Sequence, residues 1–493
     1  MSEPEISPLG DMTPEAFRRY GYQVVDWIAG YLAKVGEYPV LAQVAPGEIR
    51  RQLPEAPPAQ GESLEQVLAD FERVILPGIT HWNHPAFFAY FAITGSGPGI
   101  LGEMLSAALN VNGMLWRTSP ALTELEEHVL DWLRQMLGLP PGGLGMITDT
   151  ASISSLYAIA AAREAVPGLR VREEGLAGRP DVPRLRLYCS EQAHSSIEKA
   201  AITLGLGLAG VRKIPTDTQF RMDTAALAAA IAEDRRAGWQ PFCVVATVGT
   251  TSTTSVDPLP EIAALCQREG LWLHVDGAYA GMAAILPEMR HVLAGCDQAD
   301  SIVVNPHKWL FTPIDCSAFY CRRPDVLRRA FSLVPEYLRT AEGEAERVRN
   351  LMDYGVQLGR RFRALKLWFV IRAFGQEGLA ARLRQHIRLA QQFAAWVDAS
   401  PDFERLAPTP FSTVCFRFHP PKLSDEVELN RLNEALLEAV NATGQVYLSH
   451  TKLNGRYTLR LAIGNLRTTE AHVARAWELV QREAARLHIQ RER

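Results

Sequence analysis

The stretch Asn305-Pro306-His307-Lys308-Trp309 begins where a short apolar run, residues 302–304, ends. A second apolar run, residues 271–275, leads in the same way into Asp276. Both runs have the length and the β-branched or leucine-rich content that is typical of buried strands. In α/β proteins, ligands bind beyond the carboxyl ends of parallel strands. The two stretches therefore predict the type of sheet and also the edge at which a functional site lies.

Short apolar runs alternate with helical stretches from about residue 145 to residue 325. This alternation is typical of an α/β domain with a mainly parallel sheet. The runs that we interpret as strands are residues 185–189, 243–248, 271–275, 302–304 and 317–320.

The flanking regions have different patterns. Residues 13–35 form an amphipathic pattern that Thr13 can cap, and residues 54–61 are a proline-rich connector. Beyond residue 400 we expect a smaller α+β unit, with a strand at 412–418, a helix at 428–440, a hairpin at 446–463 that turns at Asn454-Gly455, and a closing helix at 468–487. We therefore predict three parts: a helical segment 1–90, a large domain 91–370 and a small domain 371–493.

The composition excludes several classes of protein. The chain has 493 residues, 47% hydrophobic and 22% charged, with a net charge of −4, which gives no reason to expect nucleic acid or an anionic membrane as a partner. Its seven cysteines form no C-x-x-C pair, as expected in a reducing compartment. The polar residues at the start do not resemble a signal peptide, and no apolar stretch approaches the roughly 20 residues that span a bilayer. We expect a cytoplasmic protein.

Lys308 and Asp276 together suggest a specific chemistry. A lysine among apolar neighbours is pushed toward its neutral form, which can build a Schiff base with an aldehyde. An aspartate at the end of a strand can hold the charge of a protonated ring nitrogen. Pyridoxal phosphate (PLP) needs both groups. Each residue also has a simpler interpretation, since Lys308 could extend to solvent and Asp276 could cap the next helix.

Other polar residues fit the same cofactor. Asp149-Thr150-Ala151-Ser152 precedes a helical pattern and could bind a phosphate, to which Asn305 could add a donor, although the segment taken alone favours simple helix capping. The flat ring of His194 could stack on a cofactor, or it could cap a helix. His307 could assist proton transfer or bond to a carbonyl. The histidines at 81, 84, 274 and 307 lack metal-ligand spacing, so we expect no metal.

Several segments in the same order resemble the pyridoxal-dependent group II amino acid decarboxylases, especially the aromatic-L-amino-acid decarboxylases. The resemblance covers about residues 12–487. The segments are Thr80-His81-Trp82, Phe88-Ala89-Tyr90-Phe91, Ser119-Pro120-Ala121-Leu122-Thr123-Glu124-Leu125-Glu126, Ala193-His194-Ser195-Ser196, Gly249-Thr250-Thr251, Leu273-His274-Val275-Asp276, Asn305-Pro306-His307-Lys308-Trp309, Asp315-Cys316-Ser317 and residues 358–366.

The resemblance implies the type I PLP-dependent fold, similar to that of aspartate aminotransferase. It also implies an obligate homodimer with active sites at the subunit interface. In that arrangement residues 1–90 pack across the dimer, residues 91–370 bind the cofactor and residues 371–493 form the small domain.

The resemblance assigns roles to individual positions. Lys308 matches the Schiff-base lysine, Asp276 the pyridinium partner, and His194 the ring-stacking histidine, while Tyr337 matches the tyrosine of a mobile catalytic loop. Further cofactor contacts fall on Thr150, Ala151, Ser152, Thr251, Ala278, Asn305 and His307. The substrate-binding positions are Trp82, Tyr90, Phe91, Ile93, Met114 and Gly359.

The chain departs from animal relatives at several of these positions. Ala92-Ile93 replaces Pro-Thr, and Asn112 and Met114 stand where those relatives have an apolar residue and an aromatic one. Thr150 replaces serine and keeps the hydroxyl. A glycine at position 359 goes with bulky aromatic substrates in related plant and animal enzymes.

The sequence thus predicts an enzyme that decarboxylates aromatic L-amino acids, of the tryptophan, DOPA, tyrosine or phenylalanine type, to amines and CO₂. One alternative is an aromatic acetaldehyde synthase, which in this family goes with loss of the loop tyrosine or the stacking histidine, both present here. Another is a decarboxylase of a non-aromatic amino acid such as glutamate, for whose carboxylate Ile93 and Met114 offer no partner. A non-catalytic scaffold protein would be expected to lack Lys308 or Asp276.

Overall fold

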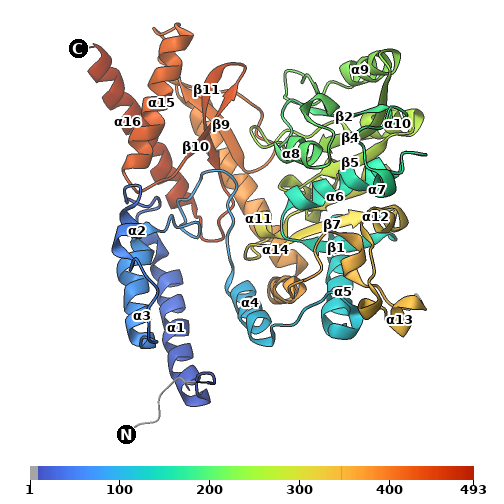
Figure 1. The fold of residues 1–493 in the computed structure, drawn as a ribbon. Helices are drawn as coiled ribbons and strands as arrows, with labels where there is room; N and C mark the ends of the chain where they lie inside the picture. The colour runs from blue at the N-terminus through green and yellow to red at the C-terminus, as the bar shows by residue number, and fades with distance from the viewer. Residues whose placement is uncertain (1–8, 346, 493) are drawn as a thin grey trace.

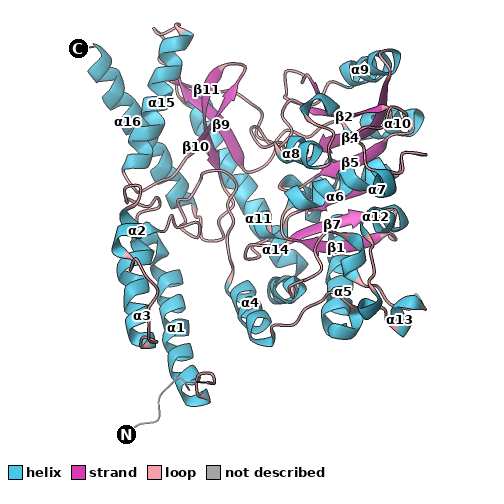
Figure 2. Ribbon diagram, in the orientation of Figure 1, coloured by secondary structure: helices cyan, strands magenta, loops and turns pink. Residues whose placement is uncertain are grey.

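A seven-stranded sheet is the central element of the computed structural model, which describes residues 9–345 and 347–492 (Figures 1 and 2). The strand order is β1-β7-β6-β5-β4-β2-β3. The strands are β1 (Leu144–Thr148), β2 (Arg184–Ser190), β3 (Val211–Ile214), β4 (Trp239–Thr247), β5 (Trp272–Asp276), β6 (Ser301–Val304) and β7 (Ser317–Cys321).

The strand directions confirm the expected mainly parallel sheet. β3, β2, β4, β5 and β6 pair in parallel, whereas β7 is antiparallel to both β6 and β1. β1 therefore runs in the same direction as β5 and β6, and the carboxyl ends of these three strands lie at one edge. All five predicted strands are present. β1 and β3 were not predicted, because β1 is short and contains Gly145 and because β3 reads Val-Arg-Lys-Ile.

Helices on both sides of the sheet complete the large domain (Figure 2). They include α5 (Pro120–Leu137), α6 (Ala151–Glu164), α8 (Ser196–Thr203), α9 (Thr224–Arg236), α10 (Leu259–Glu269) and α12 (Pro324–Phe331). Residues 157–162 of α6 are all buried, and four of the six are alanine, which lets the helix lie close to the strands. The segment before α6, where we expect a phosphate to bind, is therefore anchored by a tightly packed helix.

The small domain contains a four-stranded antiparallel sheet, ordered β10-β11-β9-β8. Its elements are β8 (Phe403–Arg405), β9 (Thr413–Phe418), α15 (Glu426–Ala442), β10 (Ser449–Leu453), β11 (Arg456–Ala462) and α16 (Glu470–Glu492). The hairpin turns at Asn454 and Gly455 as predicted, and both residues have positive φ, 50° and 80°. α14 (Arg363–Ala399) enters this domain from the large one with a kink at Gly375, so the expected boundary at residue 370 falls inside a helix.

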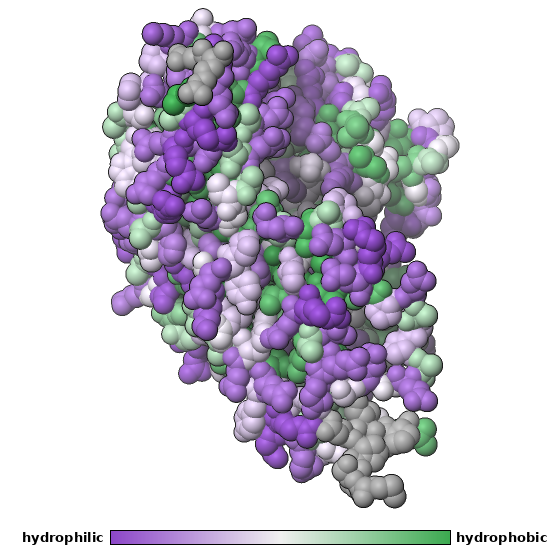
Figure 3. Space-filling view, turned by 90° about the vertical axis from the view of Figure 1, so that its left-hand side faces the viewer, coloured by the Kyte–Doolittle hydropathy of each residue, from purple (hydrophilic) through white to green (hydrophobic). Residues whose placement is uncertain are grey.

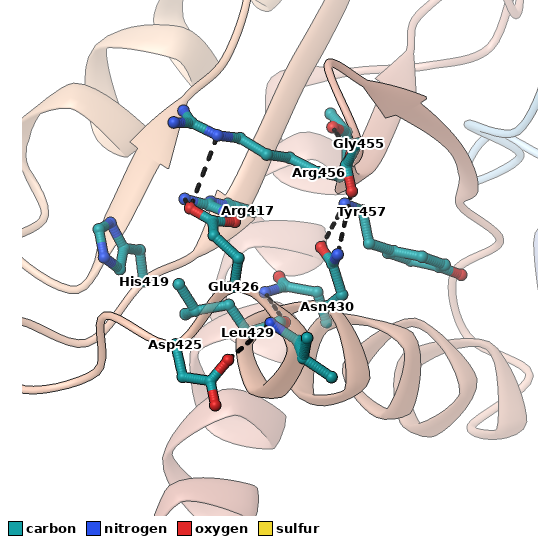
Figure 4. Close-up of polar contacts among 12 residues, drawn as sticks. Arg417, His419, Asp425, Glu426, Leu429, Asn430, Gly455, Arg456 and Tyr457 are labelled. Carbon is teal, nitrogen blue, oxygen red and sulfur yellow. Dashed lines mark hydrogen bonds and ion pairs between the residues drawn. The ribbon is translucent and has the colours of Figure 1, made fainter.

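A polar network joins α15 to the sheet of the small domain (Figure 4). The buried Arg417 donates from Nη1 to Glu426 at 2.7 Å and also pairs with Glu404. The Asn430 side chain accepts from the Tyr457 N–H and donates to the Gly455 carbonyl, at 2.6 and 3.0 Å. These bonds fix the hairpin against the start of the helix.

Two helices at the N-terminal end stand side by side and project away from both domains (Figure 1). They are α1 (Pro14–Lys34), which Thr13 caps as predicted, and α3 (Leu64–Asp70); the short α2 (Glu48–Gln52) comes between them in the sequence. Large apolar side chains remain exposed on this pair, namely Phe17, Tyr22, Val24, Val25 and Val67. α4 (Gly97–Leu109) also exposes Leu101, Met104, Leu105 and Leu109. In Figure 3, hydrophobic surface interrupts the polar surface on the side of the molecule that carries the helix pair.

Among the described helices, none is long and apolar enough to cross a membrane.

Candidate active site

Lys308 lies in α11 (Pro306–Trp309), the single turn that follows β6. Its Nζ is 5.4 Å from the centre of the Phe91 ring, and its side chain is half-buried. Burial lowers the pKa of the ammonium, and the nearby Asp276 carboxylate opposes that shift. Lys308 therefore does not simply extend to solvent, and it is more easily deprotonated than a surface lysine.

Asp276 is the last residue of β5, the strand next to β6, and its side chain is buried. One of its oxygens accepts from the Ala278 N–H at 3.1 Å. Behind it, His274 is bonded at both ring nitrogens, to Ser301 Oγ at 2.9 Å and Ser155 Oγ at 3.2 Å. Burial lowers the pKa of His274 to about 4, so this imidazole is neutral.

His194 lies in the loop between β2 and α8. Its Nδ1 accepts from the Ser196 N–H at 3.2 Å and contacts the Ser196 hydroxyl at 2.9 Å. The surrounding protein desolvates the ring and lowers its pKa, Asp276 raises that pKa, and Lys308 lowers it. The helix-capping interpretation is therefore correct for Nδ1, while the rest of the side chain is exposed and can meet a flat ligand.

The expected phosphate loop leads from β1 into α6. The helix begins at Ala151, earlier than its apolar pattern suggests, and Thr150 makes no side-chain cap. The N–H groups of Ile153 and Ser154 bond to the Thr150 carbonyl. Among the described hydrogen bonds, none engages the N–H groups of Ala151 and Ser152. A helix start with open N–H groups attracts an anion, so the geometry suits a phosphate better than simple side-chain capping.

Asn305 and His307 take part in a buried network that holds the Lys308 turn. Asn305 Oδ1 accepts from Ser317 Oγ at 2.7 Å, and the Cys316 N–H donates to His307 Nδ1 at 2.9 Å. Burial, assisted by Lys308, lowers the pKa of His307 to about 3. His307 is therefore neutral, and both residues fix the backbone that carries Lys308.

An aromatic column lies beside Lys308. The Phe91 and Tyr279 rings stack at 3.9 Å, and Tyr279 stacks on Trp309 at 4.8 Å. The buried Arg460 guanidinium is 5.3 Å from the Phe91 centre and donates to Ser252 O and Ser449 Oγ. Sequence reasoning missed Tyr279 and Arg460. Tyr279 lies only three residues after Asp276, which was the one local signal available.

The remaining expected positions form separate groups. Trp82, Tyr90 and Tyr447 cluster, with Tyr90 and Tyr447 hydroxyls 3.1 Å apart and Tyr90 at φ 52°. Ile93 is half-buried, Thr251 is exposed in the loop after β4, and Ala278 is buried beside Asp276.

A further group contains Met114, which packs with Leu338 and Met352, and Gly359, which faces Asn112. Within the described residues, no hydrogen bond, ion pair or ring contact links this group to Lys308, Asp276 or His194. Tyr337 lies in the short turn Glu336–Leu338, and its side chain falls outside the described part of the structure. The charged segment 335–350 contains this turn and one short helix, α13 (Ala341–Glu344).

The residues present fit PLP. Lys308 offers an amine of lowered pKa, Asp276 a buried carboxylate, and the start of α6 open N–H groups, all at the carboxyl edge of one sheet. No cluster of metal-ligating side chains occurs among the described residues. Fold and site together define a PLP-dependent enzyme of the type I fold.

Comparison with known proteins extends this assignment. Residues 46–419 match the family described as "Pyridoxal-dependent decarboxylase conserved domain". The chain is 43% identical to tyrosine decarboxylase 4 of Petroselinum crispum over 488 residues, which cover 97% of this chain and 95% of that one. It is also 43% identical to phenylacetaldehyde synthase of Arabidopsis thaliana, with 97% and 98% covered. The crystal structure of Oryza sativa TDC with PLP and tryptamine superposes with a TM-score of 0.93 at 38% identity, covering 98% and 99% of the chains.

The chain belongs to the pyridoxal-dependent decarboxylase family, and its cofactor is pyridoxal 5′-phosphate. The resemblance noted in the sequence is thereby confirmed, and so are the fold class and the carboxy-lyase activity.

Proposed function

We propose that this enzyme converts aromatic L-amino acids to their amines and CO₂. The observation that carries the proposal is the position of Lys308 and Asp276 at neighbouring strand ends, beside the stacked ring of Phe91. The names of the relatives agree, since one is a tyrosine decarboxylase and a solved neighbour holds tryptamine. Incubation of the purified holoenzyme with all twenty amino acids, with CO₂ and amine measured, tests the proposal.

PLP, when bound, supplies an electron sink for the charge left on Cα after CO₂ departs. Lys308 would hold the cofactor through its Nζ, and the substrate amine would take that position. The Asp276 carboxylate would hold a proton on the pyridine nitrogen, and the face of His194 would orient the ring. The buried surroundings strengthen the interaction of Asp276 with that charge, because few waters screen it.

Tyr337 returns a proton to Cα from its phenol, acting alone or together with His194. The segment 335–350 that carries Tyr337 is rich in Glu and Arg and has little apolar content, so it can move toward and away from the site. Closure of this segment would exclude water while the proton is transferred.

The substrate side chain meets apolar and aromatic groups. Phe91, Ile93 and Met114 provide no partner for a carboxylate, so acidic substrates would be desolvated without compensation. Gly359 leaves space for a bulky ring, because its nearest neighbour to an added Cβ would be Asn112 at 3.8 Å. Tryptophan-like or broadly aromatic substrates fit this combination best.

An aromatic acetaldehyde synthase is the second candidate, because one relative at 43% identity carries the name phenylacetaldehyde synthase. In the family to which the sequence is similar, that activity goes with loss of the loop tyrosine or the stacking histidine. This chain has Tyr337 and His194, which favours amine formation.

We further propose a homodimer with shared active sites, located in the cytoplasm. The apolar side chains of α1, α3 and α4 are exposed in one chain, and contact with a second copy would bury them. A dimer would also let Met114, Gly359 and Tyr337 of one subunit serve Lys308 of the other, since no described contact links Met114 or Gly359 to Lys308 within one chain. The seven cysteines are free and buried, as suits a reducing compartment.

A further inference from the structure

Glu126 and Arg360 form a buried ion pair on the free edge of β1. The two side chains are 1% and 6% exposed, and Arg360 Nη2 contacts Glu126 Oε1. Glu126 comes from the middle of α5, whereas Arg360 lies three residues before the start of α14. Taking both charges out of water is costly, so a pair in this position requires a structural reason beyond stability.

The pair brackets a single backbone residue. The Ile147 N–H donates to Glu126 Oε1 at 2.8 Å, and the Ile147 carbonyl accepts from Arg360 Nη2 at 3.0 Å. β1 is an edge strand that pairs only with β7 among the described strands, so its other edge has no neighbouring strand to bond these groups. The ion pair replaces the missing strand at Ile147.

Ile147 is four residues before Ala151, where α6 and its open N–H groups begin. A shift of Ile147 would therefore shift Thr150, Ala151 and Ser152. The Thr148 side chain, next along the strand, is bonded to Ser154 Oγ at 2.7 Å and so couples the strand to the helix.

The backbone of Arg360 is itself held in place. Its N–H donates to Asn112 Oδ1 at 3.0 Å, and its carbonyl accepts from the Gly113 N–H at 2.9 Å. The backbone bonds of Arg360 thus fix the start of its side chain, so that the guanidinium reaches Ile147 of β1.

We propose that Glu126 and Arg360 are positioning residues. They hold the phosphate loop, residues 150–152, in the position in which it binds the 5′-phosphate of the cofactor. This inference rests on the proposed cofactor site. Neither residue touches the cofactor; they act through Ile147.

The test compares two ligands on the apo-protein. Pyridoxal has the same aldehyde and ring as PLP but lacks the phosphate, so the ratio of the two dissociation constants isolates the phosphate contribution. The tendency of free pyridoxal to cyclise is the same for every variant and cancels in the comparison. Binding is followed by the visible absorbance of the Lys308-bound ligand, and thermal unfolding is recorded for each variant.

Arg360→Lys keeps the charge but ends one bond short of the Nη2 position that contacts both Glu126 and Ile147, and Glu126→Gln keeps the shape but removes the pairing charge. We expect each to lower the preference for PLP over pyridoxal by at least about tenfold, the size of one charged hydrogen bond. Arg417→Lys is the matched control, since Arg417 is a buried arginine of the small domain that pairs with Glu426 (Figure 4) and also with Glu404. It should lower thermal stability and leave the preference unchanged.

Equal weakening of both ligands, or the same loss of preference in Arg417→Lys, would overturn the inference. Ser152→Pro, which removes both the open N–H and the hydroxyl from the first turn of α6, where proline is tolerated, separates it from the site assignment. If Ser152→Pro lowers the preference and Arg360→Lys does not, the role of the ion pair is wrong and the phosphate loop stands. If neither changes the preference, the loop assignment fails and the inference fails with it.

Discussion

Lys308 Nζ lies 5.4 Å from the centre of the Phe91 ring, on which Tyr279 stacks at 3.9 Å. The reactive amine therefore lies beside an aromatic wall, to which Trp309, its neighbour in sequence, adds by stacking on Tyr279. The wall desolvates the ammonium and favours the neutral, nucleophilic amine.

Replacing Lys308 with alanine should abolish turnover. It should also abolish the visible absorbance of the lysine-bound cofactor, because Lys308 is the one lysine of the turn that follows β6. Spectra of the dialysed variant check the prediction. A persistent absorbance of that kind would mean that the cofactor is attached elsewhere.

Asp276→Asn should bind PLP weakly and turn over slowly. Removing one partner of a buried charged pair costs about 3–5 kcal/mol, which corresponds to at least about a hundredfold in rate or affinity. Steady-state rates and PLP titration measure both effects. Near wild-type turnover in the asparagine variant would show that the ring nitrogen does not depend on this carboxylate.

Aromatic amino acids should outcompete glutamate and aspartate in kcat/KM. An unpaired polar group transferred to an apolar wall costs at least about 2 kcal/mol, so the ratio should be about thirtyfold or greater. Competition assays with paired substrates check this ratio. A preference for either acidic substrate contradicts the apolar wall that we assign to Ile93 and Met114.

Tyr337→Phe removes one hydroxyl and keeps the ring. If its phenol supplies the proton to Cα, amine formation should fall by about 10²-fold or more. Cα then remains electron-rich for longer and open to dioxygen, so aldehyde, ammonia and peroxide should appear. Product analysis by chromatography measures both routes. Amine at the normal rate without aldehyde would make His194 the leading proton donor.

The loop itself can be tested by proteolysis. The segment between about residues 335 and 350 has few apolar side chains, so a protease should cut it first in the substrate-free enzyme. A non-reactive substrate analogue should slow that cut if the segment closes over the site. If the protease instead cut within α9 or α15 before it cut residues 335–350, that result would argue against a mobile catalytic loop.

The sequence predicted the strands that carry Lys308 and Asp276 because each is a continuous apolar run followed by a polar residue. It also predicted the hairpin at Asn454-Gly455, whose two positive φ angles these residue types tolerate. It missed β1, in which Gly145 interrupts the apolar pattern. Apolar runs of this kind indicate buried strands, and turn residues such as Asn-Gly indicate hairpins.

Other parts of the site depend on contacts between distant segments. Arg460 reaches Phe91 from the small domain, and Arg360 reaches Glu126 across more than 230 residues. No periodicity or local motif contains that information. The relation of Tyr337 and Met114 to Lys308 requires, in our proposal, a second subunit, which one sequence cannot place.

The stoichiometry of products from an aromatic substrate tests the central claim most directly. Holoenzyme incubated with carboxyl-labelled L-tyrosine, and separately with carboxyl-labelled L-tryptophan, is assayed for labelled CO₂, amine and peroxide. The account predicts one amine for each CO₂ from at least one of the two substrates, with no peroxide above the enzyme-free control. CO₂ accompanied by aldehyde and peroxide in place of amine, or no CO₂ from either substrate, would contradict it.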